Sequence, residues 1–174
     1  MKRIEGNGIV KKENRQVGPF TAISSAGSWD VMIADGPSGE IQVEGDTNLP
    51  EALETVVEDG KLLIRSKNHV SFKTRNKLTV YVTMDKLNGL SLSGSGDIIG
   101  EGRFFNEGTS VFRISGSGNI RLRFRGYRGF RQRQCRTFRK YRGTKSLYQR
   151  QRQTDQAGYI RVKVRSPKYK VRSG

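Results

Sequence analysis

The chain is poor in the residues that cross-link, kink or titrate a small protein. Its 174 residues include one cysteine, four prolines, one histidine and one tryptophan. A single cysteine excludes an internal disulfide framework, so cysteine content says nothing about the compartment. No run approaches the roughly 18 consecutive apolar residues that a membrane-spanning helix needs. We therefore expect no membrane span.

A recognisable export signal is also missing. Residues 1–8, MKRIEGNG, contain basic residues with no apolar segment after them, whereas a signal peptide has an apolar region of roughly 7–15 residues. We expect no signal peptide in this chain.

Negative charge is nearly absent from the last third of the chain. Residues 1–122 contain 15 Lys and Arg against 15 Asp and Glu, and residues 123–174 contain 18 Lys and Arg against Asp155 alone. The tail therefore carries the whole net charge of +17. Because two such compositions rarely share one folded unit, we predict a single β domain over residues 6–122 and an Arg-rich tail over residues 123–174.

The first two thirds of the chain predict an all-β fold. Apolar and polar residues alternate as they do in half-buried strands, most clearly in residues 20–24, 29–34 and 78–83. No segment keeps a 3.6-residue period.

Two local signals interrupt the strands. Asp59-Gly60 lies between two apolar runs and predicts a tight hairpin, because glycine supplies the positive φ that such turns require. Pro50 near the start of a short segment predicts a helical turn, with Thr47 or Asn48 as its cap.

A repeat follows these strands. Residues 90–98, LSLSGSGDI, are echoed by residues 112–120, FRISGSGNI, 22 positions later. A strand, a Gly-Ser-Gly turn and another strand at this period predict a β-solenoid, or parallel β-helix-like, fold. We expect glycine to permit the corners and stacked Asp or Asn to cap backbone groups there. The predicted structural turn residues are Gly94, Ser95, Gly96, Asp97, Gly116, Ser117, Gly118 and Asn119.

The tail has two interpretations, and the first takes it as a nucleic-acid-binding arm. Arginines alternate with aromatic residues such as Phe130, Phe138 and Tyr141, which suits phosphate contacts and base stacking. With few apolar residues to build a core, such an arm is expected to be disordered when alone.

The second interpretation is a displaced reading frame. Residues 130–135, FRQRQC, are encoded by TTC CGG CAG CGG CAA TGC among other choices. Without its first base, this DNA encodes Ser-Gly-Ser-Gly-Asn. Residues 148–154, YQRQRQT, shifted in the same direction, give Ile-Ser-Gly-Ser-Gly-Lys for one set of codons. The repeats then start at Ser93, at Ser115, at the codon of Phe130 and at the codon of Gln149. These starts are 22, 15 and 19 positions apart. We favour this interpretation, in which residues 123–174 are the frameshifted remainder of the β domain.

The in-frame part resembles the putative auto-transporter adhesin, head GIN domain family. The resemblance is carried by Gly6-Asn7-Gly8-Ile9, Phe20-Thr21-Ala22-Ile23, residues 29–33, 56–62 and 78–83, and the repeated Gly-Ser-Gly-Asp/Asn-Ile. It implies a β-helix-like domain of bacterial envelope or secreted proteins, with no established biochemical role. The chain departs from the family by its missing export signal and by the later repeats, which are lost in frame. We expect such a chain to be poorly soluble or to have a disordered tail.

No residue stands out as catalytic, cofactor-binding or metal-binding. His69 is expected to be solvated, and Cys135 has no histidine near it in the sequence. The acidic run at Glu51, Glu54, Glu58 and Asp59 is interpreted as a solvated face. Trp29 and Tyr81 are expected in the core, with sugar stacking at an exposed position as the alternative. Asp97 and Asn119 lack the nine-residue period of calcium-binding β-rolls.

These observations predict a non-enzymatic envelope or secreted β-solenoid domain with an adhesin or structural role. Its partners would be glycans or proteins on a cell surface, and no cofactor is expected. The alternative function is nucleic-acid binding through the arginine and aromatic arm, if the tail is genuine. A third class, a polysaccharide lyase or hydrolase, would require a cluster of carboxylates on one sheet, which the sequence does not locate.

Overall fold

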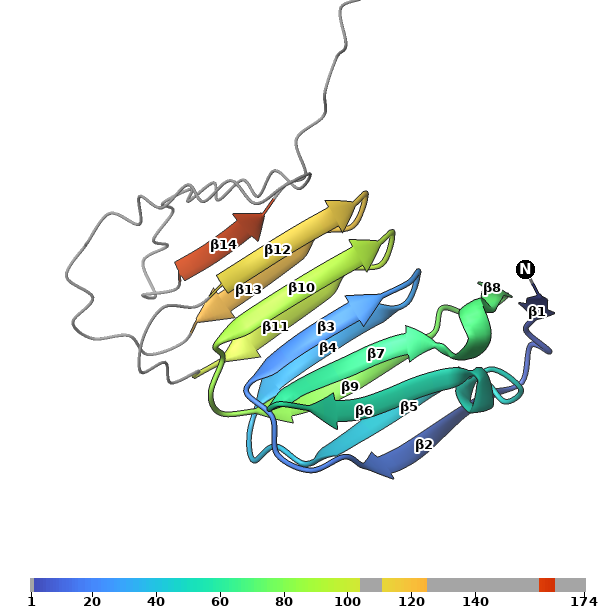
Figure 1. Cartoon of the computed structure of the whole chain (residues 1–174), viewed down its shortest axis with the longest axis horizontal. Coiled ribbons are helices and arrows are strands. Elements are labelled where there is room, and N and C mark those ends of the chain that lie inside the picture. Colours follow the sequence, from blue (N-terminus) through green and yellow to red (C-terminus); the bar gives the residue numbers. More distant parts are fainter. Residues whose placement is uncertain (1, 104–110, 125–159, 165–174) are drawn as a thin grey trace, which may run out of the picture.

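The computed structural model describes residues 2–103, 111–124 and 160–164 (Figure 1). Strands make up nearly all of its regular structure, and the two helices, η1 (Pro50–Ala52) and η2 (Lys67–His69), are single 3₁₀ turns. The predicted all-β class is confirmed. Within the described ranges, no helix has the length and apolar character to cross a membrane. The tail, which we expected to be disordered, lies outside the described residues apart from its first two positions and residues 160–164.

Two large sheets face each other. The seven-stranded sheet has the order β14-β13-β11-β4-β9-β5-β2 and comprises β2 (Val10–Gln16), β4 (Asp30–Asp35), β5 (Glu40–Asp46), β9 (Thr79–Met84), β11 (Ile98–Gly102), β13 (Ile120–Phe124) and β14 (Ile160–Val164). The five-stranded sheet has the order β12-β10-β3-β7-β6 and comprises β3 (Ala22–Ala26), β6 (Leu53–Glu58), β7 (Lys61–Ser66), β10 (Gly89–Gly94) and β12 (Val111–Gly116). A small parallel pair joins β1 (Arg3–Glu5) to β8 (Ser71–Lys73).

The parallel strands form four stacked coils, each made of one strand from either sheet. Coil A is β3 and β4, coil B is β7 and β9, coil C is β10 and β11, and coil D is β12 and β13. Within each sheet the coils pair in parallel. Coils C and D align Leu90 with Phe112 and Ile98 with Ile120, which is the 22-residue offset of the sequence repeat.

The order of the coils in space differs from their order in the chain. The sheets place them as B, A, C and D, although coil A comes first in the sequence. Residues 36–88 leave coil A, build coil B on one side of it, and return to start coil C on the other side (Figure 1). Only coils C and D therefore follow each other directly, as successive rungs would.

Antiparallel strands cover the coil B end of the stack. Strand β5 pairs with β9, β2 pairs with β5, and β6 pairs with β7. The hairpin between β6 and β7 turns at Asp59 (φ 51°) and Gly60 (φ 72°), so the predicted hairpin is confirmed. Two positive φ values are the requirement of a type I′ turn.

The predicted helical turn is η1, but its predicted cap is wrong. Leu49 precedes the turn, and no side chain caps it. The Asn48 side chain is used elsewhere: its Nδ2 donates to the Glu5 carbonyl at 2.8 Å, and its Oδ1 accepts the Asn7 N–H at 3.1 Å. Tertiary contacts with the N-terminal segment thus replace the local cap.

One arginine ties the two sheets together at this covered end. Arg15 on β2 donates from Nη1 to the Leu53 carbonyl at 2.8 Å and to Thr55 Oγ1 at 3.2 Å, and from Nη2 to the Pro50 carbonyl at 2.6 Å. Hydrogen bonds from a charged donor are stronger than neutral ones. Arg15 therefore holds β2 against η1 and β6 where the sheets meet.

The core lies between the sheets and is built from alternate strand residues. Trp29 is 2% exposed and meets the Phe72 ring edge-on, with centroids 5.8 Å apart, which confirms its predicted core position. Tyr81 was also expected in the core, and that prediction is wrong, because it is 36% exposed. Val80 and Val82 point inward, so the two-residue period of β9 places Tyr81 on the outer face.

The alternation makes a direct prediction for coil C. Leu92 is 1% exposed, whereas the next residue, Ser93, faces solvent. Leu92→Ala should lower the free energy of unfolding by about 2–5 kcal/mol, through lost burial and a cavity between the sheets. Ser93→Ala on the same strand should change it by less than about 0.5 kcal/mol. Urea unfolding of both variants measures the difference, and equal effects would contradict the assigned faces.

Candidate functional site

Three Gly-Ser turns stack at one end of coils A, C and D. They are residues 27–30 (Gly-Ser-Trp-Asp), 94–97 (Gly-Ser-Gly-Asp) and 116–119 (Gly-Ser-Gly-Asn). The strand register places them directly over one another. Sequence reasoning found the last two and missed the first, because Trp29 stands where the others have glycine. The shared Gly-Ser-x-Asp/Asn pattern was the available signal.

The Gly-Ser turns approach one another so closely that there is no space for a side chain at their third position in coils C and D. The Gly27 carbonyl accepts the Gly96 N–H at 3.1 Å, and the Gly94 carbonyl accepts the N–H of Gly118 at 3.1 Å. A Cβ on Gly96 would overlap the Trp29 carbonyl, and one on Gly118 would overlap the Gly96 carbonyl. Glycine is therefore required at these positions by the contact with the preceding coil.

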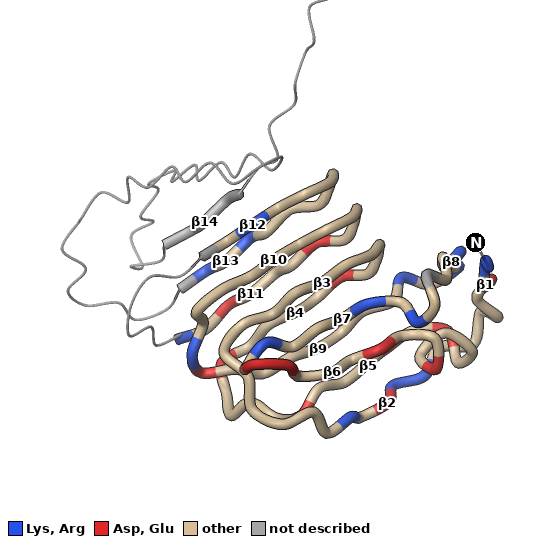
Figure 2. The backbone as a smooth tube through the Cα atoms, viewed as in Figure 1, with Lys and Arg blue, Asp and Glu red and all other residues tan. Residues whose placement is uncertain are grey.

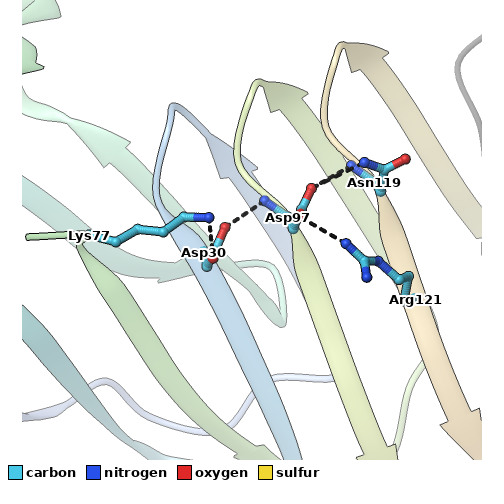
Figure 3. A network of polar contacts seen from close by, with 5 residues as sticks. All are labelled: Asp30, Lys77, Asp97, Asn119 and Arg121. Atoms are coloured by element: carbon cyan, nitrogen blue, oxygen red, sulfur yellow. Dashed lines mark hydrogen bonds and ion pairs between the residues drawn. The ribbon is translucent and has the colours of Figure 1, made fainter.

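A ladder of carboxylate and amide groups runs along the same turns (Figure 3). Asp30 Oδ1 accepts the backbone N–H of Asp97 at 2.9 Å, and Asp97 Oδ1 accepts that of Asn119 at 2.9 Å. Each side chain thus caps a backbone group of the next coil. Figure 2 shows the acidic positions recurring at the same end of neighbouring coils.

Cations occupy the second oxygen of each carboxylate in this ladder. Lys77 Nζ lies 2.6 Å from Asp30 Oδ2, and Arg121 Nη2 lies 3.2 Å from Asp97 Oδ2. The hydrogen bond to Asp30 raises the pKa of Lys77 above its ordinary value. Both carboxylates are therefore engaged in joining coils.

The other residues singled out from the sequence are not brought together into a site. Glu51, Glu58 and Asp59 are exposed, and Glu54 is bound by Arg65 Nε at 2.6 Å, which lowers the pKa of Glu54. No group of three or more His, Cys, Asp or Glu residues in the described ranges is placed to hold a metal ion.

His69 ends η2. Cys135 lies outside the described residues.

The outer face of the seven-stranded sheet carries an arrangement that the sequence did not reveal. Its strands align Gln42, Tyr81, Met32 and Ile99 side by side; we call this line the outer row. Tyr81 is exposed and the other three are half-buried. The row draws on four strands that are distant in the chain, so only the exposed tyrosine in an alternating strand hinted at it.

A basic residue flanks the outer row. Lys12 Nζ lies 5.4 Å from the centre of the Tyr81 ring and 3.0 Å from Glu44 Oε2. The hydrogen bond to Glu44 raises the pKa of Lys12. An aromatic ring beside charged and amide groups on a flat sheet can stack on one face of a ligand while polar groups bind its edge.

The opposite outer face, on the five-stranded sheet, is lined by small residues. Register places Ser24 beside Ser91, and Ala26 beside Ser93, which in turn lies beside Ser115. This face offers no aromatic ring among these positions.

The Gly-Ser turns generate a stability prediction. Gly96→Ala should lower the free energy of unfolding by about 2–3 kcal/mol, because the new methyl group forces coils A and C apart. Gly60→Ala is the matched control: it has open space but a left-handed φ, so it should cost only about 1–2 kcal/mol. Chemical denaturation of the two variants makes the comparison. A Gly96→Ala protein as stable as the parent would refute the close approach of the turns.

Comparison with solved structures finds the same fold in larger proteins. One is a putative lipid binding protein from Parabacteroides distasonis, with 24% identity and a TM-score of 0.57 over 68% of this chain and 51% of that one. Putative adhesins from Parabacteroides merdae (17% identity, TM-score 0.56, covering 65% and 47%) and Bacteroides fragilis (17%, 0.53, covering 68% and 55%) also match. The chain therefore spans about half the length of these structures.

Comparison with curated proteins gives no match. A family model, described as putative auto-transporter adhesin, head GIN domain, matches residues 19–127, which is more than half of the chain. The matched region contains coils A to D and all three Gly-Ser turns. The chain is therefore a member of the putative auto-transporter adhesin, head GIN domain family.

Proposed function

We propose that this chain is a non-enzymatic adhesion or structural domain of the bacterial cell envelope or of a secreted protein, and that its coils are part of a β-solenoid. The observation that carries the proposal is the family membership of residues 19–127. The fold agrees with it, because stacked coils present long, regular faces that suit extended partners.

The solenoid architecture is supported by the registers and by the ladder. Coils A, C and D pair in parallel with equivalent residues aligned. The second and third Gly-Ser turns each donate backbone hydrogen bonds to the turn before them. In repeat architectures each unit contacts only its neighbours, and stability comes largely from such interfaces. The excursion of residues 36–88 then forms a cap for the first coils.

A structural or adhesive role is supported by the use of the carboxylates. Asp30 and Asp97 spend both oxygens on the next coil and on a cation. A general acid or base must instead be placed to reach a proton of the substrate. The carboxylates of the ladder join coils, so their geometry favours architecture over catalysis.

The outer row is the binding surface that we assign to this domain, with a cell-surface glycan as its ligand. Sugar rings present an apolar face and a polar edge. Tyr81 offers an exposed aromatic face, and Gln42 next to it offers an amide. Lys12 adds a positive charge beside the ring.

This surface can be tested with the full chain on immobilised bacterial and host glycans. Tyr81→Ala should weaken binding roughly tenfold, as expected for an aromatic anchor at the centre of an interface. Ser91→Ala on the opposite outer face is the control and should leave binding unchanged. Equal binding by parent and Tyr81→Ala proteins would exclude the outer row, and glycan turnover would exclude the non-enzymatic role.

Nucleic-acid binding remains the second candidate, because the net charge of +17 lies wholly in the tail. One structural observation favours it: β13 and β14 align Arg121 with Lys163 and Arg123 with Arg161. The two strands therefore place four basic residues in one part of the sheet, a concentration of basic positions that suits a polyanion.

The salt dependence of RNA binding tests this candidate. If the tail is a binding arm, affinity should fall steeply and linearly in a plot of log K against log salt. The charge-removing pair Arg161→Ser and Lys163→Ser should flatten that slope by about 1–2, while Lys2→Ser, far along the chain, should have little effect. A slope that stays the same in both variants would exclude β14 as the binding element.

A further inference from the structure

The stack of coils ends differently on its two sides. Coil B is covered by antiparallel strands β5, β2 and β6. At the other side, β14 pairs antiparallel with β13 in the seven-stranded sheet. In the five-stranded sheet β12 is the terminal strand, and within the described ranges no strand pairs with its outer edge. An unpaired edge strand exposes backbone donors and acceptors that template a further strand.

The last Gly-Ser turn is built to receive another turn. Gly116 has a φ of 113°, close to the 108° of Gly94. Gly94 already accepts hydrogen bonds from the turn of coil D. The Gly94 carbonyl accepts N–H groups of Ser117 and Gly118 at 3.0 and 3.1 Å. By the same geometry, the Gly116 carbonyl is the acceptor for a following turn.

The ladder also has a next position. Asp30 Oδ1 and Asp97 Oδ1 each accept the N–H of the equivalent residue in the following coil. Asn119 Nδ2 faces back to Asp97 Oδ1 at 3.4 Å, and in Figure 3 its oxygen points away from Asp97. Asn119 Oδ1 is thus oriented as the acceptor for one more coil.

The sequence of the chain departs from its family at this same boundary. The family match ends at residue 127, a few residues after the point where acidic residues disappear. The matched structures are longer than this chain, which covers 51% and 47% of the first two.

The codons of the tail permit the missing turns one base out of frame. The codons for residues 130–135, FRQRQC, shifted by one base, permit Ser-Gly-Ser-Gly-Asn, which is identical to residues 115–119. The codons for residues 148–152, shifted in the same direction, permit Ile-Ser-Gly-Ser-Gly, which is identical to residues 114–118. The close packing of the Gly-Ser turns shows why both glycines recur: no other residue fits.

We propose that the open edge formed by β12 and the Gly-Ser turn at residues 116–119 is a docking surface for a further coil, and that its occupant is the coil encoded one base out of frame by the codons of residues 130–135. Asn119 Oδ1 accepts the N–H of the shifted Asn, and the Gly116 carbonyl accepts an N–H of the shifted turn. This proposal rests on the solenoid architecture proposed above.

The nucleotide sequence of codons 118–174 is the first test. We expect the shifted frame to encode Ser-Gly-Ser-Gly-Asn and Ile-Ser-Gly-Ser-Gly without a stop codon between them. Several arginine codons exclude these motifs: AGA, CGA, CGC or CGT at residue 131 removes the first glycine, because the shifted codon then no longer begins with GG. Such codons at either site would overturn the proposal.

A frame-restored protein, made by removing one base between codons 122 and 130, tests the docking itself. Its melting temperature should exceed that of the chain as read by at least about 5 °C, because the added coil buries the open end. A second frame-restored protein, with the shifted turn's two glycines changed to valine, is the matched control and should lose this gain.

Substitution of the ladder's last member adds a test at single-residue level. Asn119→Ala should lower the melting temperature by about 3–5 °C more in the frame-restored protein than in the chain as read, because only there is Oδ1 an acceptor. Asn119→Asp keeps an acceptor oxygen at this position and should largely preserve the melting temperature of the frame-restored protein. If Asn119→Ala lowers the melting temperature equally in the frame-restored protein and in the chain as read, the proposed docking is wrong. Tyr81 lies on the outer face of the seven-stranded sheet, away from the open edge. A measurement of glycan binding therefore tests the proposed function independently of the docking.

Discussion

The contact on which this structure depends is the stacking of Gly-Ser turns with no space for a side chain between them. A carbonyl of one turn receives N–H groups of the next, and a Cβ at Gly96 or Gly118 would occupy the place of the neighbouring carbonyl. This spacing fixes the register of both sheets at once, because each turn joins a strand of one sheet to a strand of the other. The parallel pairing, the inward alternation of Leu and Ile, and the alignment of Asp30, Asp97 and Asn119 follow from it.

Parallel coils also create ends, and the chain treats its two ends differently. At coil B the chain reverses direction, so antiparallel strands cover the edge and Arg15 ties the sheets together. This arrangement places residues 36–88 outside the simple order of the coils. At coil D the described residues show such a strand in the seven-stranded sheet, where β14 runs antiparallel to β13. The pairing places Val162 opposite Leu122 and Arg161 opposite Arg123.

The sequence predicted those features that depend on local pattern and missed those that depend on distant partners. Strand alternation, the Asp59-Gly60 hairpin and the 22-residue offset each lie within a short segment, and the structure shows all three. The cap of η1 was wrong, because Asn48 bonds to residues more than 40 positions away. Tyr81 was placed inside because its aromatic character was weighed above the two-residue period of β9. The first Gly-Ser turn was missed because Trp29 stands where the other two turns have glycine.

That last difference explains why the turns are not interchangeable. In coils C and D the third turn position packs onto the carbonyl of the coil before it and must be glycine, whereas coil A begins the series of Gly-Ser turns and can carry a large ring there. Trp29 uses this freedom to fill the core against Phe72. The series begins at coil A, and each later member packs on the turn before it. Asn119 has the form of an internal member, with glycine beside it and its amide oxygen facing outward. The last described member of the series therefore resembles an internal one, which agrees with the further coil that we propose beyond it.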